Sequence, residues 1–564
     1  MSLKNTFILL YRKYPLVRIA TLILAVCLVV GVLSFFSTHT KRLPAITSIT
    51  PAVGEPGDIM TITGNEFGAL RSPESYVEIG GSRITASGYL SWSNKEIRVI
   101  LPTNVQDGLV IVGTKSGASK PGFFANKAGI PVAVPVDTKT TMPIITAITP
   151  SANSYGSLIS LSGSNFGTIR GESQVFFTAN RDDSESTLTD TFNLSFIPAS
   201  EGNYDYEYWS DSEIHVRIPD GAANGAVYVL TDKGESNHVQ LQVKNVCGTR
   251  SFTDRKTYVL QLTTDVESPD PKAQLSVTLR VPRPPVTAQQ PHADLAECTP
   301  EPLIENYRNM TIHQLEFDKN TSRKIRVSQN FVVSAYTVTT SITERAVKPF
   351  AEKSRVLYTA ATTPDTLIQS NNSDVQALAA EIVKRETNPY RQARLIYNYM
   401  LDTYTLSSAS QKKRTSPLEL LSKKKGDAYD FAVIYTTLVR ACGIPALPIG
   451  GVLVDADLKA TPHWWTELYL ENFGWVPVDV ALGAGLSYKA FRPIHDARLF
   501  YFGNLDSQHV AFSRGWNEVK PSFVNSKTVY RERTYALQSI WEESVNETVN
   551  YSSLWNVPTV LGIY

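Results

Sequence analysis

An uninterrupted apolar run lies near the start of the chain. Residues 19–36 contain no charged side chain, and a helix of this length can cross the hydrocarbon core of a bilayer. Four Lys and Arg residues lie within the first 18 positions. The positive-inside rule therefore predicts a cytoplasmic tail over 1–18, a transmembrane helix over 19–36 and an extracytoplasmic remainder, periplasmic or on the cell surface. No small-x-small cleavage site follows the run, which favours an uncleaved anchor over a signal peptide.

After about residue 43 the pattern changes to short runs in which apolar and polar residues alternate. Two examples are Ile97–Leu101 and Val227–Leu230. Gly, Pro, Asn and Asp separate these runs, and this spacing is typical of a small antiparallel β-sandwich. The pattern therefore predicts an all-β region between the apolar run and about residue 245.

This all-β region contains an internal repeat. Its first two blocks shift by 99 positions and its third by 117, so the second copy holds 18 additional residues. The blocks and their counterparts are Pro44–Pro51 and Pro143–Pro150, Ile62–Gly68 and Leu161–Gly167, and Trp92–Ile97 and Trp209–Ile214. We predict two sandwich domains, over 43–137 and 143–245, with the additional residues near 178–208. The glycines of the second block suit a strand end and turn that need positive φ.

The rest of the chain changes from strand-like to helical spacing. The pattern over residues 246–350 predicts a further β-rich domain, which a Pro-rich stretch interrupts. Three later segments have apolar residues at helical spacing, and they are 375–383, 391–400 and 428–441. Strand-like segments follow, at 447–454, 463–470 and 475–478. We predict an α+β domain over 370–525 and a C-terminal extension over 526–564.

Charge and histidine spacing exclude several kinds of partner. The chain has 54 Lys and Arg residues against 53 Asp and Glu, a net charge of +1, so no overall field attracts nucleic acid. Its eight histidines lack the spacings that metal ligation needs. No Gly-rich phosphate-binding loop precedes a helix with the required Lys. The sequence therefore predicts no metal, no nucleotide and no other cofactor.

The four cysteines fit an exported protein. Cys27 lies in the apolar run, and Cys247 and Cys298 lie in the β-rich region. The last two could form a disulfide in an oxidising compartment, or they could be two buried thiols. The sequence leaves both alternatives open.

The α+β segment carries four ordered motifs. They are Gly426-Asp427-Ala428-Tyr429-Asp430, Arg440-Ala441-Cys442-Gly443-Ile444-Pro445, His463-Trp464-Trp465-Thr466-Glu467 and Gly474-Trp475-Val476-Pro477-Val478-Asp479. Their order resembles the transglutaminase-like superfamily of papain-type thiol enzymes. The opening I-T-x-I-x-P with G-x-x-F-G, present twice in the β region, resembles the IPT/TIG immunoglobulin-like domain. The resemblances imply two immunoglobulin-like sandwiches followed by a papain-like core.

The resemblance also implies roles for individual residues. In the superfamily a cysteine at a helix N-terminus is the nucleophile, a histidine exchanges its proton and an aspartate orients the ring. The matching positions here are Ala428, His463 and Asp479. Asp427, Trp465 and Trp475 are the residues expected to line a substrate or peptide groove. A methyl group cannot attack a carbonyl, so the resemblance predicts the fold while Ala428 argues against the chemistry.

Cys442 does not replace the missing sulfur. It lies fourteen residues along the same predicted helix, which places it about 21 Å from Ala428 at 1.5 Å per residue. We therefore expect a small core residue there.

The sequence is consistent with three functions. The first is a membrane-anchored extracytoplasmic pseudoenzyme that binds a protein or peptide, or acts as a scaffold in an envelope assembly. The second is an active thiol enzyme, for amide acyl transfer or peptide hydrolysis, whose cysteine was replaced by Ala428 in this chain or whose function another residue took over. The third is a purely structural envelope protein.

Overall fold

The computed structural model describes most of the chain. The described ranges are 11–39, 42–102, 105–126, 142–179, 196–268, 275–306, 309–317, 323–407, 416–515, 528–530, 534–536, 541–544 and 551–564. The chain divides into two compact units after Asn126. Each unit is described by itself.

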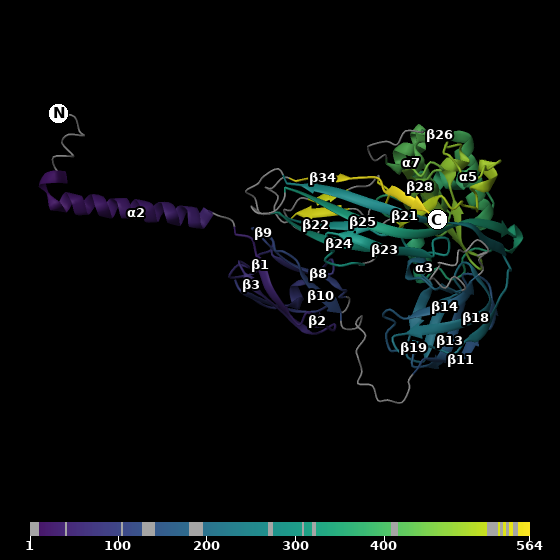
Figure 1. Ribbon diagram of the computed structural model, residues 1–564, viewed down its shortest axis with the longest axis horizontal. Coiled ribbons are helices and arrows are strands. Elements are labelled where there is room, and N and C mark those ends of the chain that lie inside the picture. Colours follow the sequence, from purple (N-terminus) through teal and green to yellow (C-terminus); the bar gives the residue numbers. More distant parts are fainter. Residues whose placement is uncertain are drawn as a thin grey trace. The chain divides into compact units, whose positions relative to one another are not determined.

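Helix α2 (Pro15–His39) covers the apolar run near the N-terminus (Figure 1). Among the described residues, no helix combines the length and the apolarity that a membrane span requires. The transmembrane segment over 19–36 stays a prediction. The tail over 1–18 lies partly outside the described residues, which begin at 11.

The first unit contains a β-sandwich with a short 3-10 helix, η1 (Ala86–Gly88). One sheet has the order β1-β3-β7-β6 and the other β2-β10-β8-β4-β5, with β9 beside β8. Their bounds are β1 Ala45–Thr50, β2 Val53–Gly54, β3 Ile59–Asn65, β4 Tyr76–Ile79, β5 Ser82–Arg83, β6 Tyr89–Trp92, β7 Glu96–Ile100, β8 Gly108–Thr114, β9 Gly117–Ala118 and β10 Gly122–Asn126.

The second unit begins with a sandwich of the same topology. Its sheets have the orders β11-β13-β17-β16 and β12-β20-β18-β14-β15, with β19 beside β18. Their bounds are β11 Ile144–Thr149, β12 Ala152–Asn153, β13 Leu158–Ser164, β14 Gln174–Ala179, β15 Phe196–Pro198, β16 Tyr206–Trp209, β17 Glu213–Arg217, β18 Ala222–Thr231, β19 Gly234–Glu235 and β20 Val239–Val243. Within the additional residues predicted near 178–208, the structure has β15, a 3-10 helix η3 (Glu201–Asn203) and the start of β16; residues 180–195 lie outside the described ranges.

The two sandwiches repeat one local arrangement. Trp92 donates its indole N–H to the Phe67 carbonyl at 2.9 Å, and Trp209 donates to the Phe166 carbonyl at 3.2 Å. The glycine that follows each phenylalanine has positive φ, +90° at Gly68 and +89° at position 167. The sequence repeat is thus matched by a repeat in structure. The predicted positive φ is confirmed at Gly68 and Gly167 but not at Gly64 and Gly163, the other glycines of the block.

The β-rich domain is built on two long antiparallel strands, β21 (Gly248–Glu267) and β25 (Lys324–Ile342). Its sheets have the orders β23-β25-β21-β34, with β35 also beside β21, and β24-β22-β33-β32. The other bounds are β22 Leu275–Pro282, β23 His292–Thr299, β24 Met310–Phe317, β32 Thr528–Tyr530, β33 Trp541–Ser544, β34 Ser552–Trp555 and β35 Thr559–Ile563. The expected C-terminal extension over 526–564 is therefore not separate, because its described strands complete this domain by pairing with β21 and β22.

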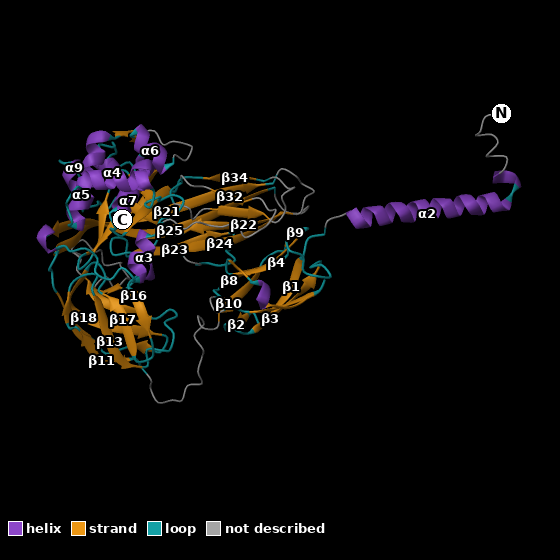
Figure 2. Ribbon diagram, turned by 180° about the vertical axis from the view of Figure 1, so that it is seen from behind, coloured by secondary structure: helices purple, strands orange, loops and turns teal. Residues whose placement is uncertain are grey.

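The α+β core contains a four-stranded sheet of order β30-β29-β28-β31 and a group of helices that lie together in both ribbon views (Figures 1 and 2). The strands are β28 Ala446–Val454, β29 Ala460–Leu470, β30 Gly474–Val478 and β31 His509–Arg514, with a short parallel pair β26 Thr405–Leu406 and β27 Lys425–Gly426. The helices are η4 Glu344–Ala346, α3 Val356–Thr362, α4 Ser373–Val383, α5 Pro389–Thr403, α6 Pro417–Lys423, α7 Ala428–Ala441, α8 Val480–Gly483 and α9 Ala497–Phe500. The predicted helices over 375–383, 391–400 and 428–441 correspond to α4, α5 and α7.

Helix α7 is buried from Ala428 to Arg440. Its hydroxyl-bearing Thr436 meets Thr466 of β29 at 2.9 Å, and Thr466 also donates to the Ala432 carbonyl at 3.3 Å. These bonds join the first half of the helix to the middle of the sheet. The start of α7 is thereby fixed in the interior of the core.

The thiols are unpaired. Cys247 and Cys298 are both free, the first buried and the second half-buried. Of the two alternatives left open by the sequence, the structure has two separate thiols. Burial raises the pKa of each.

Candidate active site

The candidate site begins at the N-terminus of α7. Asp427 is the N-cap residue, and its side chain accepts a hydrogen bond from the Asp430 backbone N–H at 3.1 Å. The Asp430 carboxylate in turn accepts from the Asp427 N–H at 3.2 Å. This reciprocal capping box satisfies donors that a helix start leaves unpaired. Ala428 is the first residue of the helix and is 7% exposed.

His463 and Asp479 are brought together by the sheet. His463 lies on β29, and Asp479 follows the end of β30, where it also caps α8 by accepting from the Leu482 N–H at 2.8 Å. His463 Nε2 lies 2.5 Å from Asp479 Oδ2. Among the described residues, Nδ1 of His463 has no hydrogen-bond partner. The ring is therefore oriented by Asp479 through one nitrogen and leaves the other for a reacting group.

A second histidine shares the same carboxylate. His509, the first residue of β31, places Nε2 at 3.1 Å from Asp479 Oδ2. Its Nδ1 lies 2.8 Å from Asp506 Oδ1. The hydroxyl of Tyr501 donates to Asp506 Oδ2 at 2.8 Å. No role for His509 could be assigned from the sequence, because it lies 46 residues after His463 and only the pairing of β31 with β28 brings it to the site.

The pKa values of His509 and Asp479 depend strongly on the charges of the neighbouring buried side chains. Burial lowers the pKa of His509, but Asp506 and Asp479 outweigh it and raise the value to about 9. Burial raises the pKa of Asp479, but the charges and hydrogen bonds of His463 and His509 outweigh it and hold that pKa well below its usual range. At neutral pH His509 is therefore a cation between two carboxylates.

His463, Asp479 and His509 are the group of side chains best suited to bind a metal ion in the described part of the chain. One potential ligand atom from each of His463, Asp479 and His509 lies within 4.8 Å of the others. Asp479 Oδ2 already accepts from both rings. A bound cation would have to replace these two hydrogen bonds.

The residues expected to line a groove are buried instead. Asp427 is 3% exposed, Trp465 1% and Trp475 5%. Asp427 caps α7, and the ring of Trp465 stands edge-on to His509 with centroids 5.2 Å apart. Trp475 lines a different pocket, together with residues of the second sandwich. The two indoles therefore do not form one open apolar groove, because neighbouring side chains cover them; a role in ligand binding stays a prediction.

Strand geometry places His463 on a particular face of the sheet. Thr466 faces α7, and side chains alternate between the two faces of a strand. β29 pairs with β28 in regular register from Ala460 to Leu468. The side chains of His463 and Trp465 therefore project from the face of the sheet opposite to that of Thr466. The superfamily resemblance implies that the His463 ring approaches the Ala428 methyl group to within about 5 Å, and this approach stays a prediction.

Cys442 is the C-cap residue of α7, at the end opposite Ala428. Burial raises the pKa of its thiol to about 11. A thiol with this pKa is almost fully protonated at neutral pH and is a poor nucleophile. Both its place and its pKa agree with the expected core role.

Comparisons with known proteins identify two regions. Residues 376–480 match the model of the Transglutaminase-like superfamily, and residues 44–125 match that of the IPT/TIG domain. An uncharacterized protein of Haemophilus influenzae is 25% identical over 168 residues, which cover 25% of this chain and 46% of the relative. A cyclomaltodextrin glucanotransferase of Paenibacillus macerans is 37% identical over 88 residues, covering 15% of this chain and 12% of that enzyme. The chain thus spans less than half the length of these relatives.

Two solved structures are similar to parts of the chain. A candidate cysteine protease from Cytophaga hutchinsonii has 16% identity and a TM-score of 0.35, covering 56% of this chain and 91% of its own. The periplasmic domain of TgpA from Pseudomonas aeruginosa has 13% identity and a TM-score of 0.22, covering 39% of this chain and 87% of its own. By the two family models, the chain carries an IPT/TIG domain over 44–125 followed by a transglutaminase-like core over 376–480.

Proposed function

We propose that this protein is a catalytically inactive transglutaminase-like protein, anchored in a membrane through residues 19–36 and extending into the extracytoplasmic space. It acts by binding a protein or peptide partner, or as a scaffold in an envelope assembly. The observation that carries the proposal is Ala428. It is the first residue of α7, the position at which the superfamily resemblance requires a thiol, and an alanine side chain offers no lone pair for attack.

The charge pattern supports the anchor. Basic residues lie before the apolar run, and the sandwich domains begin shortly after it. In a membrane preparation, protease added on the extracytoplasmic side should digest the chain beyond about residue 41. A C-terminal tag that remains protected under these conditions would contradict the proposed orientation.

An active enzyme is the second candidate. The arrangement around the missing sulfur favours it: the capping box at Asp427 is intact, and Asp479 holds His463 with Nδ1 free of partners among the described residues. This candidate requires that Ala428 replaced a cysteine in this chain. The buried state of Trp465 and Trp475 instead favours the third candidate, a purely structural core.

One pair of variants separates these candidates. Ala428→Cys and Ala432→Cys place the same thiol in the same buried helix, one turn apart. If the site is still assembled, the thiol at 428 should titrate below about 7.5 because of the helix dipole and His463. The thiol at 432 should titrate above about 8.5, since it is buried away from the helix start. Alkylation rates measured against pH give both values.

Activity assays complete the test. The unaltered chain should release no ammonia from glutamine peptides, form no isopeptide bonds and cleave no peptide. Turnover by the unaltered chain that is lost in His463→Ala would overturn the proposal. Turnover by Ala428→Cys alone would establish the second candidate, an enzyme that lacks only its sulfur. A thiol at 428 with an ordinary pKa and no activity would favour the structural candidate.

A further inference from the structure

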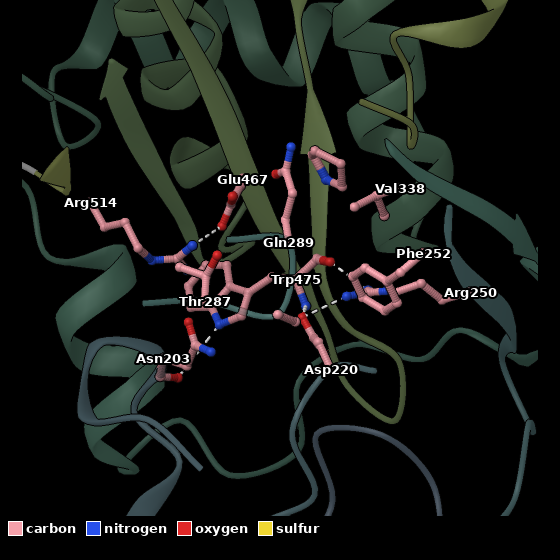
Figure 3. Close-up of a pocket in the computed structure, with 12 residues that line it drawn as sticks. Asn203, Asp220, Arg250, Phe252, Thr287, Gln289, Val338, Glu467, Trp475 and Arg514 are labelled. Atoms are coloured by element: carbon pink, nitrogen blue, oxygen red, sulfur yellow. Dashed lines mark hydrogen bonds and ion pairs between the residues drawn. The ribbon is translucent and has the colours of Figure 1, made fainter. Parts of the chain in front are cut away.

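A second pocket lies apart from the His463 site, where the second sandwich, the β-rich domain and the core meet (Figure 3). Asn203 of the sandwich, Thr287 and Gln289 of the β-rich domain, and Glu467, Trp475 and Arg514 of the core line it. Glu467 is four residues along β29 from His463, which corresponds to about 13 Å. The pocket therefore has its own set of polar groups, none of which belongs to the His463 site.

Arg514 is the unusual member of this lining. Its Nη1 forms an ion pair with Glu467, and its guanidinium carbon lies 5.2 Å from the centre of the Trp475 ring. The side chain is 7% exposed. Its Nε and Nη2 atoms are buried, and within the described part of the chain neither has a hydrogen-bond partner. Buried donors without an acceptor cost free energy, so such groups normally have a partner, whether protein, water or ligand.

The two unpartnered donors form one recognition edge. Nε–H and Nη2–H lie side by side on a guanidinium and match the two oxygens of a carboxylate. The chain itself shows this pairing at Arg326, whose Nε and Nη2 lie 2.7 and 2.9 Å from the two carboxylate oxygens of Asp265. At Arg514 the same edge is present without the acid.

The other charges around the pocket leave this edge available. Asp220 is paired with Arg250 at 2.7 Å and also accepts the Trp475 N–H at 2.9 Å. Glu467 meets Arg514 from the opposite side, at Nη1. Figure 3 shows Trp475 between these two ion pairs. Asp205 is a further buried carboxylate near Arg514: burial raises the pKa of Asp205 to about 7, while the charge of Arg514 lowers it. The charges near Arg514 thus give no general positive field, and recognition of an anion depends on the two directed donors.

We propose that this pocket binds a carboxylate through Nε–H and Nη2–H of Arg514, with the Trp475 ring beside it. The group comes either from a small free acid or from the C-terminus of a peptide. This site is independent of Ala428 and of the function proposed above.

Ligand-observed NMR with acetate as the probe tests the site at constant ionic strength. Acetate should broaden saturably with the unaltered protein, while acetamide, its neutral counterpart, should not. Arg514→Lys keeps the charge but removes the paired edge, so it should weaken acetate binding at least tenfold. Arg326→Lys, a matched change at an arginine whose edge is already occupied, should leave binding unchanged.

A second variant keeps the proposal testable if Arg514→Lys does not fold. Glu467→Gln removes the competing negative charge at Nη1 and should tighten acetate binding several-fold. Diglycine and its C-terminal amide then distinguish the two sources of the carboxylate. If diglycine binds more tightly than acetate and its amide does not bind, the ligand is a peptide C-terminus. If acetate binds more tightly, the ligand is a small free acid. The proposal is overturned by any of three results: acetate does not bind saturably, acetamide binds equally well, or acetate binding is unaffected by both Arg514→Lys and Glu467→Gln. Each of these results would leave a pocket filled by water only.

Discussion

Asp479 holds His463 by Nε2, with 2.5 Å between that nitrogen and Oδ2, in a site that is almost completely buried. An aspartate in this position fixes the tautomer and the orientation of an imidazole, which is what a general base needs. The same contact also stabilises a buried polar group, whether or not the site is catalytic. The pair therefore has a structural value that is independent of catalysis.

The first prediction separates that structural value from helix capping. Asp479→Asn keeps the shape and a cap acceptor but removes the charge that faces two histidines. Because breaking a buried ion pair leaves the other charge unpaired, we expect it to lower the free energy of unfolding by about 3 kcal/mol. Asp496→Asn is the matched control, since Asp496 caps α9 through the Leu499 N–H at 2.9 Å in an exposed position.

Denaturant unfolding followed by tryptophan fluorescence measures both variants. The Asp479 variant should lose clearly more stability than the Asp496 variant, because aspartate and asparagine cap helices about equally well. Equal small losses in the two variants would mean that the contact of Asp479 with the histidines contributes little.

Much of the fold could be predicted from the sequence. The repeat, whose blocks run from Pro44 to Ile214, predicted two sandwiches because turn glycines and alternating strands leave a strong local pattern. Helix α7 was predictable with both ends, since Asp427 is an N-cap residue and Gly443 with a following proline ends a helix. The motif order led to the pairing of His463 with Asp479, which the structure shows, and both residues lie within the range 376–480 that the family model matches.

The rest depends on contacts between distant parts of the chain. No local pattern shows that β34 and β35 return to pair with β21, about 300 residues earlier, so the C-terminal extension was interpreted as separate. No role could be assigned to His509 for the same reason. The burial of Trp465 and Trp475 was not predictable either, because a strand pattern shows which face a residue occupies but not what covers that face.

A second prediction concerns the ion pair that joins the second sandwich to the β-rich domain. Arg250 and Asp220 pair at 2.7 Å, with side chains 4% and 8% exposed. Asp220→Ala leaves the Arg250 charge buried without its partner, and we expect a loss of about 3 to 5 kcal/mol. Arg326→Ala is the control and should change stability less, because the Arg326 side chain is 60% exposed and Lys324 still lies 3.4 Å from the Asp265 carboxylate. Calorimetry of the two variants makes the comparison, and an undisturbed melting profile for Asp220→Ala would contradict this role of the ion pair.

A third prediction tests the repeated glycines of the sandwiches. A Cβ at Gly64 would lie 2.0 Å from the Ala45 carbonyl oxygen, and one at Gly163 would lie 2.1 Å from that of Ile144. Because both neighbours are backbone atoms, they cannot rotate away. Alanine at either position should cost about 3 kcal/mol or more. Gly202→Ala, where the nearest atom would be 3.6 Å away, should be tolerated. Thermal melts that show no difference between the three variants would contradict this account.

The last prediction follows from the charge on His509. Its pKa is raised from 6.5 to about 9 in the folded protein, so the folded state binds its proton more tightly than the unfolded state. The resulting stabilisation is complete below about pH 6.5 and is lost as the pH rises through about 9. It amounts to about 3 kcal/mol. His509→Gln removes this titration. The free energy of unfolding of the unaltered protein should therefore fall by more than that of the variant between pH 6.5 and 9. His215→Gln is the control for the loss of an imidazole, because His215 contacts Glu213 at 2.8 Å in the second sandwich, away from this buried group. Parallel pH curves for the unaltered protein and His509→Gln would show that His509 is not a buried cation.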